Sequence, residues 1–214
     1  MVKRKKIEFI KICGITDPKT ALECVNFNAN AIGLVFFEKS PRHLSDEKAL
    51  AICQSLPDNI ITTGVFVDKD FNFIADKIDK LSLKAVQLHG NENPDLIAAL
   101  CKKNVVVIKA VFAKRKPFFQ DAHLFYQASY LLAECGKGIL PGGNAETWNY
   151  SDIAQIKTTL PVILAGGLDP LNIHDALNMV NVSGVDVSSG VESSPGIKDL
   201  AKVENFINHV KAFQ

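Results

Sequence analysis

Two reactive side chains stand where apolar segments of the sequence end. Cys13 ends one such segment and Glu134 ends another. A thiol whose pKa is lowered by neighbouring cations acts as a base or nucleophile, and Lys11 and Arg42 are possible cationic neighbours of Cys13. Burial at the end of an apolar strand raises the pKa of a carboxyl group, which would suit Glu134 to donate a proton. An inert buried cysteine and a salt-bridged glutamate are the alternatives.

Two glycine-bearing turns could bind a phosphate group. One contains Gly166 and Gly167, and the other contains Ser188, Ser189 and Gly190. Glycine lets backbone N–H groups approach phosphate oxygens closely, and serine hydroxyls add further donors. The glycines could also serve only to make tight turns, but two such turns near the end of the chain favour a phosphate site.

Two further polar residues are candidates for binding a substrate. His89 follows a short apolar segment and could equally be a hydrogen-bonded structural histidine. Asp186 lies inside the apolar segment 184–187. Because a buried carboxylate without partners is costly, Asp186 must have either an ion-pair partner or a functional task.

The elements that position these residues are visible as a repeating pattern. Eight apolar, β-prone segments recur along the chain, and segments with helical periodicity separate them. Most of the eight are near-continuous hydrophobic runs, which is typical of a parallel sheet covered on both faces. The predicted strands are residues 8–13, 31–36, 61–67, 84–89, 105–110, 129–134, 161–165 and 184–187.

Three dipeptides mark predicted helix starts between the strands. They are Asp17-Pro18, Asn93-Pro94 and Asp169-Pro170. In each, the short polar side chain can accept hydrogen bonds from the first N–H groups of the helix, and proline fits the first helical position. We therefore expect a helix to begin at each of these sites.

The eightfold alternation of strand and helix predicts one α/β domain, a single (β/α)8 TIM barrel that spans residues 1–214. An open doubly wound sheet is the main rival. In a barrel the carboxyl ends of all strands meet at one mouth, where the active sites of such barrels lie. The candidate residues named above would then share that mouth.

Composition excludes several classes of protein. The chain has 214 residues, 47% of them hydrophobic, and 24 basic against 23 acidic residues give a formal charge of +1. This balance offers no broad positive field for a nucleic acid. Five scattered cysteines without C-x-x-C spacing indicate free thiols in a reducing compartment, hence a cytoplasmic protein. No apolar stretch is long enough for a membrane span, and the monomer and the homodimer both stay open.

Six segments on successive predicted strand ends identify a family that the chain resembles. They are residues 11–16, 33–42, 64–67, 87–90, 163–168 and 184–199. In this order they resemble phosphoribosylanthranilate isomerase, an enzyme family of tryptophan biosynthesis, and the resemblance covers essentially the whole chain. It implies a (β/α)8 barrel that converts N-(5-phosphoribosyl)anthranilate to 1-(2-carboxyphenylamino)-1-deoxyribulose 5-phosphate by an Amadori rearrangement, without a metal or cofactor.

The resemblance also implies roles for individual residues. Glu134 aligns with the family acid that protonates the ribose ring oxygen and opens the ring to a Schiff base. Cys13 aligns with the general base that removes the proton from ribose C2. Arg42 aligns with the arginine that holds the anthranilate carboxylate, a task that suits its planar fork of donors.

The sixth loop departs from the family pattern. The family acid is typically Asp, which Glu134 replaces with a side chain longer by one methylene, and Asn144 and Ala145 stand where Thr or Ser and Gly are typical. One alternative is therefore a noncatalytic barrel that only binds a phosphosugar. Another is the related isomerase of histidine biosynthesis, but that reaction would call for an acid on the first strand, where this chain has Cys13.

Overall fold

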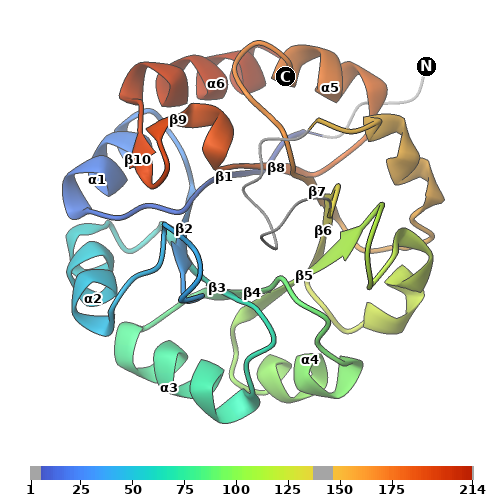
Figure 1. Ribbon diagram of the computed structural model, residues 1–214, viewed down its shortest axis with the longest axis horizontal. Coiled ribbons are helices and arrows are strands. Elements are labelled where there is room, and N and C mark those ends of the chain that lie inside the picture. The colour runs from blue at the N-terminus through green and yellow to red at the C-terminus, as the bar shows by residue number, and fades with distance from the viewer. Residues whose placement is uncertain (1–5, 137–146, 214) are drawn as a thin grey trace.

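Eight parallel strands close into a barrel in the order of the sequence (Figure 1). The computed structural model describes residues 6–136 and 147–213. The strands are β1 (Phe9–Cys13), β2 (Ala31–Val35), β3 (Ile61–Phe66), β4 (Ala85–Leu88), β5 (Val106–Phe112), β6 (Tyr130–Glu134), β7 (Val162–Leu164) and β8 (Gly184–Val187). They match the predicted strands to within two residues at each end, and β1 pairs with β8, so the prediction of a barrel is confirmed and the open sheet is excluded.

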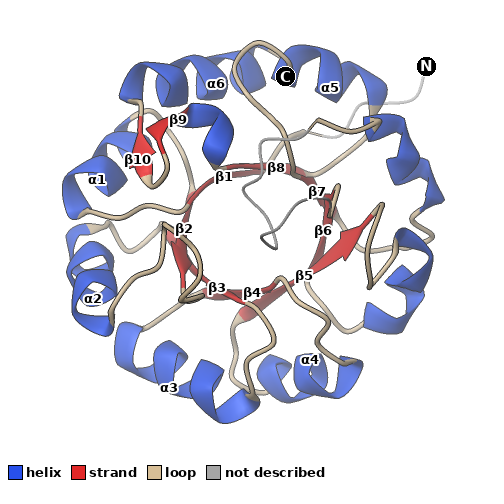
Figure 2. Cartoon of the chain, viewed as in Figure 1, coloured by secondary structure: helices blue, strands red, loops and turns tan. Residues whose placement is uncertain are grey.

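A ring of helices covers the outside of the barrel (Figure 2). The helices are α1 (Pro18–Asn26), α2 (Asp46–Ser55), α3 (Phe71–Leu81), α4 (Pro94–Cys101), α5 (Ile173–Met179) and α6 (Leu200–Ala212). After β5 and β6 the described chain forms the 3-10 segments η1 (Phe119–Phe125) and η2 (Tyr150–Gln155) instead. Within the described residues, none of the helices combines the length and apolarity needed to cross a bilayer.

Two of the three predicted helix caps are confirmed. Oδ1 of Asp17 accepts a hydrogen bond from the backbone N–H of Thr20, and Asn93 caps α4 in the same way, each at 2.9 Å. The prediction at Asp169 is wrong, because its carboxylate accepts from the N–H groups of Leu171 and Asn172 at 2.7 and 2.9 Å. This closes a turn around Pro170 and delays α5 to Ile173.

The side chains inside the barrel change character along the strands. A cluster of buried apolar side chains fills part of the interior, including Phe9, Ile108, Leu132 and Ile163. Because successive residues of a strand point to opposite faces, Phe9 on β1 shares the inward face with Lys11 and Cys13. Outward-facing neighbours on the strands, such as Ile10 and Ile12, pack instead in the larger core beneath the helices. The interior is thus apolar at one end and polar toward the carboxyl ends of the strands.

A two-stranded antiparallel hairpin follows the barrel. It consists of β9 (Glu192–Ser194) and β10 (Ile197–Lys198), preceded by the short 3-10 segment η3 (Ser189–Val191). Oγ1 of Thr16, in the loop after β1, donates a hydrogen bond to the carbonyl of Gly196 at 2.9 Å. The hairpin is thereby attached to the loop that follows the first strand.

Candidate active site

The two predicted reactive residues lie at the same end of the barrel. Cys13 is the last residue of β1 and Glu134 is the last residue of β6, and all eight strands are parallel. Gly33 on β2 leaves room for the thiol, because a Cβ there would lie 2.7 Å from Sγ of Cys13 and 3.0 Å from Cε of Lys11. The structure therefore brings both residues to one mouth, as the sequence predicts.

A buried ion pair lies beside Cys13. Nζ of Lys11 is 2.8 Å from Oδ2 of Asp186, and the Lys11 side chain is completely buried. Burial lowers the pKa of Lys11, but the charges of Asp186 and Cys13 outweigh that effect and raise it overall. The ion-pair partner that the sequence required for Asp186 is thus present, and Lys11 carries a positive charge next to the thiol.

Burial and charge act on the Cys13 thiol in opposite directions. Burial raises the pKa of Cys13, and Asp186 raises it further, while Lys11 and Lys198 lower it by a smaller amount. The sequence predicted that neighbouring cations would lower this pKa below its usual value, and that prediction is wrong. The cations are present, but the loss of solvation around a fully buried thiol outweighs them.

Glu134 forms a buried pair with His89. Nε2 of His89 is 2.7 Å from Oε2 of Glu134, and both side chains are less than a tenth exposed. Burial raises the pKa of Glu134, but His89, Arg115 and Lys11 together outweigh it and lower the pKa below its ordinary value. We predicted the opposite direction, because the sequence does not show that three cationic or ionisable side chains surround this carboxylate.

The other ring nitrogen of His89 contacts Gln87. Nε2 of Gln87 lies 3.0 Å from Nδ1 of His89. Nε2 of His89 is close to Glu134 but has no hydrogen-bond partner among the described residues. Arg115, in the loop after β5, donates a hydrogen bond from Nη2 to the carbonyl of His89 at 3.0 Å. Its guanidinium lies 3.5 Å from the centre of the Phe112 ring. Arg115 lies outside the six segments that resemble the family, so the sequence did not mark it as a site residue.

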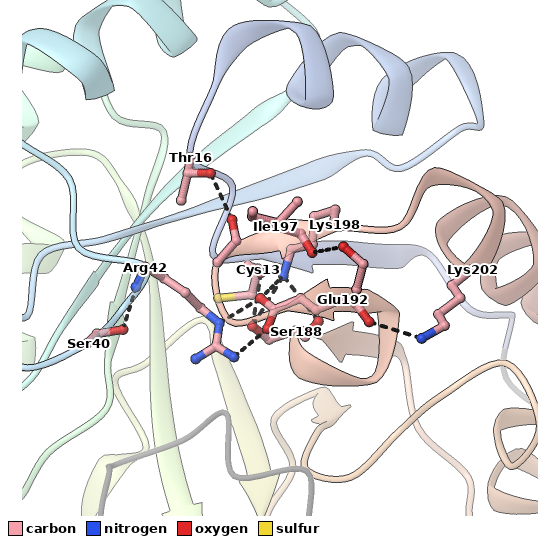
Figure 3. Close-up of polar contacts among 11 residues, drawn as sticks. Cys13, Thr16, Ser40, Arg42, Ser188, Glu192, Ile197, Lys198 and Lys202 are labelled. Atoms are coloured by element: carbon pink, nitrogen blue, oxygen red, sulfur yellow. Dashed lines mark hydrogen bonds and ion pairs between the residues drawn. The ribbon is translucent and has the colours of Figure 1, made fainter.

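A second charged cluster lies on the other side of Cys13, between the loop after β2 and the β9–β10 hairpin (Figure 3). Nε and Nη2 of Arg42 each donate to the carboxylate of Glu192 at 2.7 Å. Nζ of Lys198 donates to the same carboxylate at 2.8 Å and to the carbonyl of Ser188 at 3.1 Å. Two cations share one carboxylate, so the cluster carries one surplus positive charge. Lys198 and Glu192 lie within segment 184–199, which resembles the family, but the resemblance implied no role for either residue.

The glycine-bearing turns after β7 and β8 are in contact. A Cβ on Gly190 would collide with the carbonyl of Leu168, so only glycine allows the two loops to approach this closely. Gly166 and Gly167 have φ values of +83° and +69°, a region that favours glycine. The hydroxyl of Ser188 donates to the carbonyl of Cys13 at 3.0 Å. The predicted phosphate-binding residues therefore form one continuous surface next to Cys13.

Gly166 also borders the acid. A Cβ at this position would lie 2.7 Å from Cγ of Glu134 and 3.1 Å from Nε1 of Trp148. Trp148 donates to the carbonyl of Ala165 at 3.1 Å, and the Tyr150 hydroxyl donates to the carbonyl of Gly166 at 3.2 Å. The absence of a side chain on Gly166 thus leaves room for the side chain of Glu134.

Two of the departures from the family pattern, Asn144 and Ala145, lie outside the described residues. Within residues 6–136 and 147–213, no three His, Cys, Asp or Glu side chains are grouped so as to hold a metal ion.

Comparison with known proteins identifies the family. The family described as N-(5'phosphoribosyl)anthranilate (PRA) isomerase matches residues 10–209. The N-(5'-phosphoribosyl)anthranilate isomerase of Desulfatibacillum aliphaticivorans is 46% identical over 200 residues, which cover 94% of this chain and 91% of that protein. That of Geobacter metallireducens is 41% identical over 203 residues, which cover 95% of this chain and 98% of that protein.

Solved structures agree with this match. Phosphoribosyl anthranilate isomerase in complex with reduced 1-(o-carboxyphenylamino)-1-deoxyribulose 5-phosphate superposes with a TM-score of 0.83 at 34% identity, covering 95% of this chain and 98% of the other. The enzyme from Thermus thermophilus superposes with a TM-score of 0.86 at 29% identity, covering 96% and 100%. A match over nearly the whole chain, in sequence and in fold, shows that this chain belongs to the N-(5'-phosphoribosyl)anthranilate isomerase family.

Proposed function

We propose that Cys13 is the general base and Glu134 the general acid of the Amadori rearrangement that this isomerase catalyses. The observation that carries the assignment is that both residues end parallel strands of one closed barrel, and so lie at the same mouth. Lys11 lies on the inward face of β1 and acts electrostatically on both groups, lowering the pKa of each against the effect of burial.

The reaction requires one proton to be delivered and another to be removed. The acid protonates the ribose ring oxygen of N-(5-phosphoribosyl)anthranilate, and the C1–O bond breaks to give a Schiff base. The base takes the proton from C2, and its electron pair forms the enolamine, which tautomerises to the ketone. Burial disfavours the Cys13 thiolate, so its formation depends on the nearby charges of Lys11 and Lys198, which both favour it.

Two regions next to Cys13 match the two anionic groups of the substrate. The surplus positive charge shared by Arg42, Lys198 and Glu192 suits the anthranilate carboxylate. Because Nε and Nη2 of Arg42 donate to Glu192, we assign Nη1 of Arg42 to this carboxylate. We assign the phosphate to the contacting turns after β7 and β8, with Gly166, Gly167, Ser188, Ser189 and Gly190 as its binding residues. Asp186 and His89 line the space between these regions, where the ribose would lie.

We expect Ser189→Asp to weaken substrate binding without removing the proton-transfer groups. A carboxylate placed in the phosphate-binding turn repels the phosphate dianion and should raise KM by about 10²-fold, or roughly 2.7 kcal/mol, with a smaller change in kcat. Steady-state kinetics measures both constants. Ser194→Asp adds the same charge to the exposed end of β9 and serves as the control. Equal KM values for the two variants would place the phosphate elsewhere.

Genetic complementation separates the enzyme from a noncatalytic phosphosugar-binding barrel. We expect the chain to restore growth of a tryptophan auxotroph that lacks this isomerase, and not of a histidine auxotroph that lacks the related isomerase. Growth on neither medium, with the protein present at normal levels, would favour the binding protein. Growth of the histidine auxotroph alone would favour the second enzyme.

We place this reaction in the cytoplasm. All five cysteines are free thiols, including the exposed Cys101. Thiols persist in reducing compartments, and an exposed thiol is the first to be lost elsewhere. The reactive role proposed for Cys13 likewise requires a reduced sulfur atom.

A further inference from the structure

One carboxylate lies at the centre of the charged cluster beside the β9–β10 hairpin (Figure 3). Glu192 accepts from Nε and Nη2 of Arg42 at 2.7 Å each and from Nζ of Lys198 at 2.8 Å. All three residues are less than a tenth exposed. A buried acidic group therefore stands inside the region to which we assign the anionic carboxylate of the substrate.

The position of the Arg42 side chain is fixed on two sides. A Cβ on Gly14 would collide with Cδ of Arg42, so the stem of the arginine lies directly against the loop after β1. At the other end, Glu192 takes Nε and Nη2 in a short two-point contact, which is a strong and directional kind of hydrogen bonding. An anion bound by Nη1 therefore has the Glu192 carboxylate as its neighbour.

Burial and charge act on Glu192 in opposite directions. Burial raises its pKa, but the hydrogen bonds and charges of Arg42 and Lys198 outweigh burial and lower the pKa below its ordinary value. Glu192 is therefore ionised at neutral pH. Its charge in turn opposes the effect of burial on Lys198, whose pKa burial lowers. With the permanently charged Arg42, the cluster holds two positive charges and one negative charge.

We propose that Glu192 makes this region selective for an anionic group that carries one negative charge, and that it disfavours a group that carries two. The inference rests on the proposed assignment of the anthranilate carboxylate to this cluster, and it adds the residue that determines the charge of the accepted group. One negative charge neutralises the cluster. A second would lie unpaired beside the Glu192 carboxylate among buried groups, which is costly.

The proposal also explains how the substrate is oriented. The substrate has a carboxylate with one negative charge at one end and a phosphate with about two at the other. A phosphate at the cluster would place its second charge against Glu192. The turns after β7 and β8 instead supply backbone N–H groups and serine hydroxyls. Glu192 thus directs the phosphate to the turns and the carboxylate to Arg42.

The neighbouring charged groups stay in place when Glu192 is substituted. Nζ of Lys202, an exposed residue on α6, donates to the backbone carbonyl of Glu192 at 3.0 Å, a contact that does not depend on the side chain. Lys11 and Asp186 pair with each other at 2.8 Å, so their charges balance. Glu192→Gln therefore changes the charge of the cluster by one unit and leaves these groups as they are.

Three stable ligands separate charge from shape. Reductive amination of ribose 5-phosphate with anthranilate, 2-aminobenzenesulfonate or 2-aminophenylphosphonate gives amines that carry a carboxylate, a sulfonate or a phosphonate on the same ring. The sulfonate and the phosphonate are both tetrahedral, and they differ by one negative charge above the second pKa of the phosphonate. Isothermal titration calorimetry measures their Kd values without turnover. We expect the wild-type protein to bind the sulfonate about tenfold more tightly than the doubly charged phosphonate.

Glu192→Gln keeps the length of the side chain and removes its charge. We expect the ratio of the phosphonate Kd to the sulfonate Kd to fall about tenfold. Glu192→Asp keeps the charge and should keep the wild-type ratio, even where the shorter side chain weakens the binding of both ligands. A role confined to holding Arg42 in place would change both Kd values by the same factor. The ratio therefore reports on the charge of Glu192.

The wild-type protein provides a second measurement that needs no variant to fold. Below the second pKa of the phosphonate, both tetrahedral groups carry one negative charge, and the ratio of their Kd values should approach one. The ribose phosphate is common to both ligands, so its own titration cancels in the ratio. A ratio that is the same below and above that pKa would overturn the proposal.

Two further variants complete the test. Glu38→Gln makes the same substitution in an exposed ion pair with Lys69 and should leave the ratio unchanged. Arg42→Met should weaken binding of the carboxylate ligand, because it removes the group assigned to bind it. An unchanged ratio in folded Glu192→Gln, together with weakened binding in Arg42→Met, would overturn the role of Glu192 alone. Full affinity in Arg42→Met would instead refute the assignment of the anthranilate carboxylate to this cluster.

Discussion

Cys13→Ala is expected to lower kcat/KM by about 10²–10⁴-fold, the usual contribution of a group that moves a proton in the transition state. No other thiol lies at the mouth of the barrel among the described residues with the charges of Lys11 and Lys198 beside it. Substrate should still bind, since the contacts assigned to its carboxylate and phosphate do not involve the sulfur. The loss should therefore appear in kcat more than in KM.

A second cysteine provides the control for this prediction. Cys53→Ala removes a half-buried thiol from α2, in the outer layer, and should leave turnover unchanged. Circular dichroism and the thermal midpoint show whether each variant folds. A folded Cys13→Ala protein with turnover close to that of Cys53→Ala would exclude the thiol as the base.

Glu134→Gln is expected to cause a loss of similar size, about 10²–10⁴-fold in kcat/KM. The amide keeps the length of the side chain and can still accept from Nε2 of His89, but it cannot deliver a carboxyl proton. The measurement is the initial rate of product formation. Glu38→Gln makes the same chemical change in an exposed ion pair with Lys69 and should be neutral. Equal rates in the two variants would remove Glu134 from the mechanism.

Glu134→Asp tests the fit of the longer acid. The variant restores the residue typical of the family but withdraws the carboxyl group by one methylene from its position beside His89. We expect activity between that of the wild type and Glu134→Gln, because a displacement of about 1 Å can cost up to about 10²-fold. Full activity would mean that the sixth strand adjusts to either acid.

The sequence was sufficient to predict the barrel because each strand is marked by an apolar run of neighbouring residues. Apolar runs marked all eight strands, and the parallel order then brought Cys13 and Glu134 to one mouth. The helix cap at Asp17 could be predicted from the neighbouring residues. Asp169 is also followed by proline, but the side chain of Asn172 accepts a hydrogen bond from the backbone N–H of Asp169 at 2.9 Å. The resulting turn competes with a helix that starts directly after Asp169.

The proton chemistry could not be predicted in the same way. The pKa of Cys13 depends on Lys198 in a distant hairpin, and that of Glu134 depends on His89 and Arg115 from two other loops. Burial raises the pKa of both groups, and neighbouring cations lower it. Which effect is larger depends on distances that only the folded chain defines. The sequence therefore identified the groups but predicted the wrong direction for both.

The contacts between the first strand and the last part of the chain bear on biosynthesis. Lys11 pairs with Asp186, the Cys13 carbonyl accepts from Ser188, and Thr16 donates to Gly196. On a ribosome, these partners of the first strand are translated only after β1 to β7. A nascent chain that has not yet exposed β8 and the hairpin therefore holds the Cys13 sulfur in an incomplete environment.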